Sequence, residues 1–575
     1  MVQLVLLFSK LFFKYTLFYL FLFLLGRSFI LIIQKLFFNS RELPEKLIHI
    51  NSNIVYPIIG IIFLGNYLIF INFFLPLKSS LVLIILSILQ LINLLNIDFK
   101  INLPSYLNLK NFLFYIIIPA TLIVSSSTTN FHYDAGYYHL NHQNWLRESN
   151  LIIGMVNIFW PFGMSSINEY ISSILWFDSS FILLHFLTLF FIHFFFVFLA
   201  NNILFSKNLN FKAASYFLLF FSLLDNFGLS GGRNGFIYIQ GIGKQDIAVA
   251  VLFCFVSLVI LNSIKRKEVK ELDLVLLSLM TFFIFQLKVS GVLIFFLYFI
   301  FIFLLVINKI TSIQRILYLQ LPTIFFGFVW SIKSYLTTGC IIFPLELTCV
   351  NNFDWYWAES TKAYQEISTI SSLAYMEYFL DDSRNILNWF NDFFLSEIYP
   401  DLALFYRSVY INFIFTLIII IIIKFTLFKN DSSDRRFNLI VSTYIFSSLL
   451  YLLFFGPIPR YAMGTLLTIV SVIGFYSANE KFKINKSLTY LLIIICVVLT
   501  PRANSYIELY QNKSIAVNDP RAVEPYKEIQ TYENWVRPDK GDRCWINLKC
   551  TMHKEDINLS QDSFFKVAYR IKNLK

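Results

Sequence analysis

Long apolar runs constrain this chain more than any other feature of its sequence. Stretches of about 18 or more mostly apolar residues, long enough to cross a bilayer as a helix, recur along nearly the whole length of 575 residues. Hydrophobic residues make up 57% of the chain and charged residues 14%, whereas a soluble globular protein carries about 25% charged residues. The sequence therefore predicts an all-α polytopic membrane protein and excludes a soluble fold, a disordered chain and a small disulfide scaffold.

The apolar runs predict about fourteen transmembrane helices, the shorter of which are expected to extend into their flanks. They lie near residues 15–33, 53–76, 80–98, 111–127, 181–200, 213–229, 247–263, 273–287, 290–307, 317–337, 409–424, 437–455, 462–477 and 488–500. The expected organisation is transmembrane helices over 1–127, a first loop over 128–180, transmembrane helices over 181–337, a second loop over 338–408, transmembrane helices over 409–500 and a small C-terminal segment over 501–575.

Lysine and arginine residues are divided unevenly between the short loops, and cytoplasmic loops carry the excess of these residues in membrane proteins. One alternate set of short loops holds twenty of them, and the other holds only five: Lys78, Arg233, Lys244, Lys288 and Arg460. This division predicts that segments 128–180, 338–408 and 501–575 are extracytoplasmic. The net charge of +11 is then explained by basic loop residues beside the bilayer, so membrane lipids are the expected partners and nucleic acid is not.

The cysteines support the same sidedness. Cys254 and Cys496 lie in apolar runs and are expected in the core. The other four form two local pairs, Cys340 with Cys349 and Cys544 with Cys550, in segments predicted to be extracytoplasmic. Pairs in an oxidising compartment suggest two disulfides, although the spacing alone leaves the connectivity open.

The first loop begins with a dense run of polar and aromatic residues, 130–143 (NFHYDAGYYHLNHQ). A carboxylate directly after a span, here Asp134, can act as a general base on a hydroxyl. His139 and His142 lie close by as candidate binding residues, and aromatic rings can stack on a sugar. The competing interpretation is that Asp134 caps a short helix. Too few carboxylates accompany the histidines to indicate a metal site.

A glycine-rich stretch, 231–246, follows a later span on the same predicted side. Its glycines allow close approach of a ligand to the backbone, and Arg233 and Lys244 are natural partners of a phosphate. Asp246 comes at the start of the next apolar run. The alternative is a flexible loop in which Asp246 caps the helix.

A third constellation is the turn 456–464 (GPIPRYAMG) between two late spans. Two prolines stiffen the turn, and Arg460 leaves it at the outer boundary, where the phosphate of a lipid-linked substrate would lie. An interfacial arginine with no ligand is the alternative interpretation.

Taken together in order and spacing, five segments resemble a family of bacterial polytopic membrane proteins whose members look like GT-C glycosyltransferases. These segments are 133–139, 243–246, 338–344 with Asp354-Trp355, 459–461 and 544–550. The resemblance implies a GT-C-like fold in which Asp134 activates the acceptor, while Lys244 and Arg460 hold the phosphate of a polyprenyl-phosphate sugar. Many GT-C enzymes carry this aspartate after their first span, whereas four predicted spans precede Asp134 here.

The leading hypothesis is a glycosyltransferase of the bacterial inner membrane. It would move a sugar from a polyprenyl-phosphate donor to a glycan or lipid acceptor on the extracytoplasmic side, during assembly of cell-surface glycans. Asp134 would be the catalytic base, and His139, His142, Arg233, Lys244, Asp246 and Arg460 would bind substrate. No cofactor is expected, and a divalent metal ion is compatible with the reaction but not indicated. The alternatives are a polysaccharide polymerase or ligase, and a transporter of lipid-linked saccharides, for which few charges lie within the spans.

Overall fold

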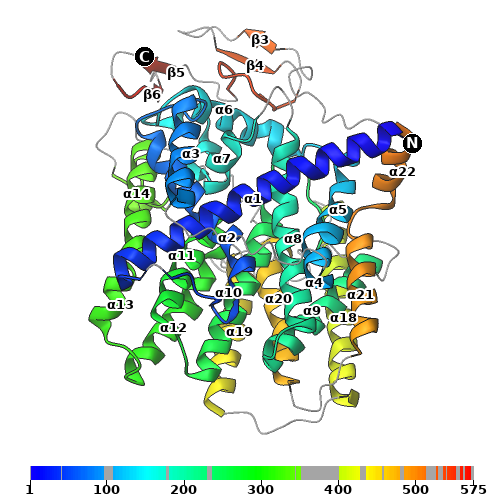
Figure 1. Cartoon of the computed structure of the whole chain (residues 1–575). Helices are drawn as coiled ribbons and strands as arrows, with labels where there is room; N and C mark the ends of the chain where they lie inside the picture. The colour runs from blue at the N-terminus through cyan, green and yellow to red at the C-terminus, as the bar shows by residue number, and fades with distance from the viewer. Residues whose placement is uncertain are drawn as a thin grey trace, which may run out of the picture.

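The computed structural model of the chain is built mostly from helices, with short antiparallel strands of the C-terminal segment at one end (Figure 1). This confirms the helical class predicted from the apolar runs. The structure describes residues 2–40, 42–95, 108–176, 181–228, 236–343, 345–350, 400–427, 435–455, 459–478, 485–512, 526–528, 535–538, 541–551, 557–560 and 564–570.

The first half of the chain alternates long apolar helices with short 3₁₀ and π segments (η). The bounds are α1 (Val2–Phe38), α2 (Ser52–Asn72), α3 (Ser80–Leu95), α4 (Leu109–Phe112), η1 (Leu113–Ile117), α5 (Ile118–Ile123), η2 (Val124–Thr128), η3 (Ala135–His139), α6 (Leu140–Glu148), η4 (Met155–Asn157), η5 (Trp160–Met164), α7 (Ile167–Ser173), α8 (Ile182–Leu204), α9 (Leu209–Phe227), α10 (Asp246–Arg266) and α11 (Glu271–Leu287).

The second half continues in the same way and ends in short strands. Its helices are η6 (Val289–Val292), α12 (Leu293–Ile307), α13 (Ile313–Leu319), α14 (Leu321–Thr338), η7 (Glu346–Thr348), α18 (Pro400–Leu427), α19 (Arg435–Phe455), α20 (Pro459–Tyr476), α21 (Lys486–Leu499) and α22 (Ala503–Asn512). Three antiparallel pairs of strands lie within the described residues: β1 (Lys46–Leu47) with β2 (Ile50–Asn51), β3 (Tyr526–Glu528) with β4 (Val536–Pro538), and β5 (Ile557–Ser560) with β6 (Val567–Arg570).

Fewer than the fourteen expected helices are found to be long and apolar enough to cross a membrane in the part of the chain that the structure describes. Among the described residues seven are long and apolar enough: α1, α2, Leu109–Thr128, α8, α10, Val289–Ile307 and Arg407–Thr426. Two bent pairs, α13 with α14 (56°) and α21 with α22 (66°), raise the number to nine if each is one span. Every predicted run overlaps a helix. Some of these helices are too short or too polar to cross a membrane, however; α11, for example, has 17 residues and carries Glu271 and Asp273 in its first turn. Fourteen spans are therefore not confirmed, and the chain has the long apolar helices of a membrane protein.

The helices divide into an interior and a periphery. In the most apolar 18 residues of α8 and of α10, 94% of the residues are buried. The corresponding shares for Val289–Ile307 and Arg407–Thr426 are 33% and 28%. Leucine, isoleucine and phenylalanine side chains left exposed on a long apolar helix suit lipid rather than water. We infer that α8 and α10 form the core of the bundle and that α12 and α18 face the bilayer.

The first two long helices pack against each other through glycine. Helix α1 has 37 residues and is therefore roughly 55 Å long, longer than a hydrocarbon core of about 30 Å. It runs obliquely across the other helices (Figure 1). A Cβ atom at Gly26 would lie 1.8 Å from the Tyr56 carbonyl oxygen, and one at Gly60 would lie 2.0 Å from the Leu22 carbonyl oxygen. Only glycine permits such close approach of two backbones.

The substitution Gly60→Ala should therefore destabilise the protein by about 1 to 3 kcal/mol, the usual cost of overpacking. Gly327→Ala in α14 is the matched control, since its Cβ would first meet the Phe282 ring at 3.7 Å, an ordinary contact, and alanine favours a helix over glycine. The apparent Tm of each detergent-purified variant checks this. Equal Tm values for the two variants would contradict the packing account.

The C-terminal segment folds back on the first loop as a cap, defined here as α6, α7 and β3–β6 together (Figure 1). The Ile153 amide donates to the Lys566 carbonyl at 2.9 Å, and the Ala568 amide donates to the Ile153 carbonyl at 2.9 Å. An apolar cluster joins the two parts: Trp145, Ile152, Met155, Ile158, Phe159 and Phe162 from the loop with Trp535, Ile557, Leu559 and Ala568 from the C-terminal segment. The sequence left open whether this segment is folded; its strands β3–β6 are part of the cap, and it begins with helix α22.

Both predicted cysteine pairs are joined. Cys340 forms a disulfide with Cys349, and Cys544 forms one with Cys550. Cys254 and Cys496 are free and buried, as expected for core residues. Of the second loop, residues 351–399, including Asp354 and Trp355, lie outside the described residues.

Candidate functional site

Two segments far apart in the sequence meet along their backbones next to the cap. The His132 amide donates to the Ile242 carbonyl at 2.9 Å, and the Ile242 amide donates to the Asn130 carbonyl at 3.0 Å. These bonds form a parallel bridge between Phe131 and Ile242. The first loop and the glycine-rich loop are thereby held together at a fixed register.

Glycine makes this contact possible. Gly243 has φ +93°, a conformation that favours glycine, and a Cβ there would lie 2.8 Å from the Ala135 Cβ. The residues on either side of this contact, Asp134 and Lys244, form an ion pair in which the Lys244 Nζ lies 2.5 Å from the Asp134 Oδ2. The backbone bridge thus positions the two charges.

Asp134 does not cap the helix that follows it. Residues 135–139 form a π-helix, and the Asp134 side chain makes no cap hydrogen bond to it. The carboxylate instead contacts Lys244 and the His132 ring, whose Nδ1 lies 3.5 Å from the Asp134 Oδ1. Short π-helical turns are rare and frequent at functional sites, so the local conformation favours the functional interpretation over the capping one.

The electrostatics of the pair keep Asp134 ionised. Burial alone would raise the pKa of the Asp134 carboxyl, but the His132 contact and the charge and hydrogen bond of Lys244 outweigh burial and hold this pKa well below its usual range. Burial lowers the pKa of the Lys244 ammonium, and Asp134 opposes that change. A carboxylate held in this way is a poor base for as long as the lysine stays beside it.

Lys244→Met should raise the pKa of Asp134, because it removes a positive charge that lowers it. In the wild type the pair stabilises the fold above the unfolded carboxyl pKa of about 3.9, and this contribution is lost as the pH falls toward the folded pKa. Infrared titration of the carboxyl band, with Asp134→Asn as the blank, should show protonation at higher pH in Lys244→Met than in the wild type. Lys244→Arg keeps the charge and is the control. Identical titrations of wild type and Lys244→Met would contradict the pairing.

A second ion pair, in which the aspartate is buried and the lysine is partly exposed, lies at the start of α10. Asp246 is paired with Lys288, which follows the end of α11, so the Asp246 side chain is not a helix cap. The Lys288 Nζ also lies 4.5 Å from the centre of the Tyr461 ring. Arg460 lies on the same ring at 5.1 Å and donates to the Tyr461 hydroxyl at 3.2 Å. The Arg460 charge acts on both Lys244 and Asp246, so it connects the two pairs electrostatically.

A cavity of about 390 Å³ opens beside the Asp134–Lys244 pair, a volume within the usual range of small-molecule sites. It is called here the Asp134 cavity. No aspartate or glutamate is among the described residues that line it, whereas two of them, Lys244 and Arg502, carry positive charges. Its walls are Ser125, Thr128, Thr129, Asn130, Phe131, His132, Tyr133, His185, Tyr238, Ile239, Gln240, Gly241, Lys244, Thr500, Pro501, Arg502, Asn504 and Ser505. Hydroxyl and amide groups together with two basic side chains suit an anionic, polar ligand.

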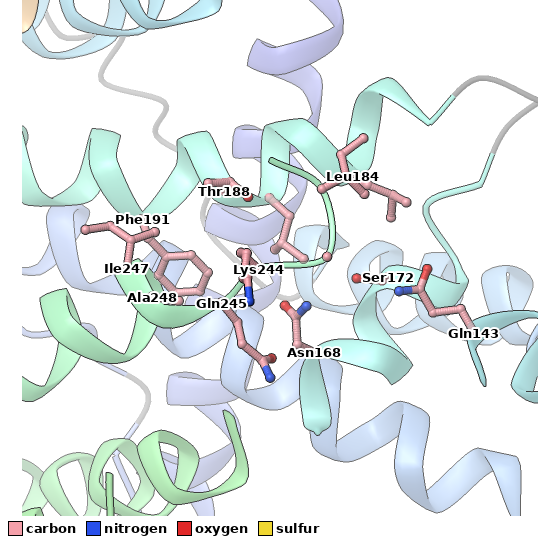
Figure 2. A pocket seen from close by; sticks show the side chains of 13 residues that line it. Gln143, Asn168, Ser172, Leu184, Thr188, Phe191, Lys244, Gln245, Ile247 and Ala248 are labelled. Atoms are coloured by element: carbon pink, nitrogen blue, oxygen red, sulfur yellow. The ribbon is translucent and has the colours of Figure 1, made fainter. Parts of the chain in front are cut away.

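A narrower pocket lies on the other side of Lys244. Figure 2 shows Lys244 and Gln245 with Asn168 of α7 on one side and Leu184 and Thr188 of α8 on the other. Its free volume is only about 20 Å³, room for one or two water molecules. This pocket gives Lys244 polar surroundings but no space for a ligand.

The C-terminal segment contacts the residues that flank Asp134. The Tyr133 hydroxyl donates to the Asp542 carboxylate, and the Trp545 amide donates to the Gly136 carbonyl at 2.9 Å. Arg543 lies 5.7 Å from the centre of the Tyr133 ring. The loop closed by the Cys544–Cys550 disulfide thus covers the π-helix that follows Asp134.

The remaining predicted site residues have different surroundings. His139 is buried in an ion pair with Glu169, which also accepts from the Gln143 amide at 2.9 Å. His142 is buried against Phe162, with ring centres 5.0 Å apart, and burial lowers its pKa to about 3. Neither histidine lines the Asp134 cavity; both pack within the cap. Arg233 lies outside the described residues.

Three residues of the cavity were missed by the sequence reasoning. Arg502 follows the last predicted span, where Pro501 interrupts the helix, so a basic residue at a span end was the available signal. His185 lies inside an apolar helix, where an ionisable residue is itself a functional signal. Its Nε2 lies 3.0 Å from the Ser125 hydroxyl, and its buried Nδ1 has no hydrogen-bond partner among the described residues. Tyr238 carried no signal at all.

No group of three or more histidine, cysteine or acidic residues in the described part of the chain is arranged to hold a metal ion. The nearest acidic and imidazole groups, Asp134 with His132 and Glu169 with His139, are engaged with each other as pairs.

Residues 9–467, most of the chain, match a family described as a domain of unknown function (DUF8201). The chain belongs to this family. No curated protein and no solved structure matches the chain.

Proposed function

We propose that this member of the DUF8201 family is a membrane glycosyltransferase that uses a sugar linked to a polyprenyl phosphate. The observation that carries the proposal is the Asp134–Lys244 ion pair at the edge of a 390 Å³ cavity whose only charged lining residues, in the part of the chain that the structure describes, are basic. A carboxylate, a cation and room for a polar anion are what transfer of a sugar from phosphate requires.

The reaction assigns a role to each group. Asp134 accepts the proton of an acceptor hydroxyl, and the acceptor oxygen forms a bond to the anomeric carbon of the sugar as the bond from that carbon to the phosphate oxygen breaks. The lipid phosphate leaves with an additional negative charge. Lys244 and Arg502, which line the cavity, stabilise this charge. Attack opposite to the leaving group inverts the anomeric configuration.

The ion pair also suggests an order of binding. His132 and Lys244 together hold the pKa of Asp134 low, so the carboxylate is a weak base in the empty site. A donor phosphate in the cavity competes for the Lys244 ammonium, and loss of this contact raises the basicity of Asp134. Donor binding would therefore activate the base that the acceptor needs.

The aromatic residues beside the cavity support a sugar ligand. Tyr133 lines it and is 47% exposed, while Tyr137 stacks on Tyr133 with ring centres 5.6 Å apart. An accessible tyrosine ring presents an apolar face with a polar edge, which matches a pyranose ring. The backbone bridge holds this ring next to Asp134.

The proposed enzyme lies in the bacterial inner membrane, with the Asp134 site on the extracytoplasmic side. The disulfide Cys544–Cys550 closes the loop that covers the Asp134 site, and stable disulfides belong to oxidising compartments. The unequal division of basic residues between loops supports the same side.

Asp134→Asn should abolish sugar transfer, because an amide cannot accept the acceptor proton, while membrane insertion and yield stay unchanged. Transfer from a panel of radiolabelled polyprenyl-phosphate sugars, in membranes that contain the protein, measures the effect. Glu148→Gln is the matched control, since Glu148 forms an exposed ion pair with Lys78. Transfer by Asp134→Asn at the wild-type rate would refute the assignment of the base.

Mass mapping of the protein under non-reducing conditions should recover one peptide pair linked through Cys544 and Cys550, and another through Cys340 and Cys349. Cys254 and Cys496, both buried and free, should be found as thiols and serve as internal controls. Thiols at Cys544 and Cys550 in protein from the native host would contradict the extracytoplasmic placement of the cap.

A further inference from the structure

A second basic pocket lies apart from the Asp134 cavity, between α11, α14 and η5. It is called here the lysine pocket, because Lys288 and Lys333 both line it together with Ser165, Ser166 and Trp330. Its free volume is about 40 Å³, room for about three water molecules. The pocket is thus sized for a small polar group and not for a sugar.

Lys333 is the unusual residue of this pocket. It is 2% exposed and lies in an apolar helix, where a buried charge costs free energy unless it is paired. Its Nζ donates to the Ser165 carbonyl at 3.1 Å and lies 4.0 Å from the centre of the Trp330 ring. No carboxylate among the described residues forms an ion pair with it. The Nζ also lies 5.7 Å from the centre of the Tyr170 ring. A carbonyl and two ring faces leave this ammonium without a carboxylate partner among the described residues.

The other charges near the pocket do not balance it. Lys288 is already paired with Asp246, so this trio of two lysines and one aspartate keeps a net positive charge. No aspartate or glutamate is among the described lining residues. The pocket therefore has the electrostatics of a site for an anion.

Two exposed apolar side chains also line the lysine pocket. Met164 and Val289 line it and are 40% and 51% exposed, and Val289 begins one of the helices that the bilayer is expected to cover. An anion that reaches Lys333 past these side chains would carry an apolar chain. We propose that the lysine pocket binds the phosphate group of a membrane amphiphile, at a site distinct from the Asp134 cavity and independent of sugar transfer.

Dodecyl phosphate is the probe for this site, with the full chain in phosphatidylcholine nanodiscs. Trp330 touches Lys333 and so reports binding through its fluorescence, and Trp330→Phe supplies the blank. The wild type should give a saturable signal. Lys333→Met should raise the half-saturating concentration at least tenfold, whereas Lys78→Met, which changes only an exposed ion pair with Glu148, should leave it unchanged.

The controls separate binding from folding and lipid from free anion. Lys333→Met should melt at or above the wild-type temperature, because it removes a buried unpaired charge; if it does not fold, Lys333→Gln replaces it. If Lys333→Met or Lys333→Gln binds dodecyl phosphate with the same half-saturating concentration as the wild type, the proposal is overturned. An equal fluorescence response to inorganic phosphate at the same concentrations would refute the assignment of an amphiphile as the ligand. The absence of any saturable signal would refute the existence of the binding site.

Discussion

The backbone bridge between Phe131 and Ile242 is the constraint on which the candidate site depends. Asp134 and Lys244 are 110 residues apart in sequence, and each partly buried charge is stabilised by the other. Two amide hydrogen bonds fix the register of the two loops, and Gly243 allows the close contact with Ala135. The ion pair follows from this geometry, and so does the position of the cavity.

One short turn connects the two ion pairs. Within residues 243–246, Lys244 supplies the cation of one pair and Asp246 supplies the anion of the other. The first pair joins this turn to the loop before the cap, and the second joins it to the end of α11. Arg460 acts electrostatically on both. A ligand that displaces Lys244 from Asp134 would therefore change the charge balance felt by the second pair and by the lysine pocket beyond it.

The sequence predicted the class of fold and part of the site. Hydropathy identified the helices, but only seven to nine of the described spans are long and apolar enough to cross a membrane, so fourteen spans are not confirmed. Helix α11, for example, is shorter and has acidic residues in its first turn. Asp134 and Lys244 were both identified, since each breaks an apolar context. Their pairing was not, because a contact formed by backbone bonds between distant loops leaves no local pattern.

The histidines of the first loop show the opposite case. His139 and His142 were predicted to bind a ligand. In the structure His139 instead contacts Glu169, and His142 stacks on Phe162. Arg502 and His185 line the cavity instead, and His185 is brought there by the packing of α8. Burial partners from other elements decide which polar side chains remain available, and a single sequence does not contain that information.

A density map of the protein in nanodiscs that contain a polyprenyl phosphate would show whether the Asp134 cavity binds the phosphate of this lipid. The account predicts phosphate density in the Asp134 cavity within hydrogen-bonding distance of Lys244 and close to Arg502, with the Lys244 ammonium turned away from Asp134. An empty cavity with an intact Asp134–Lys244 pair at saturating lipid would contradict it.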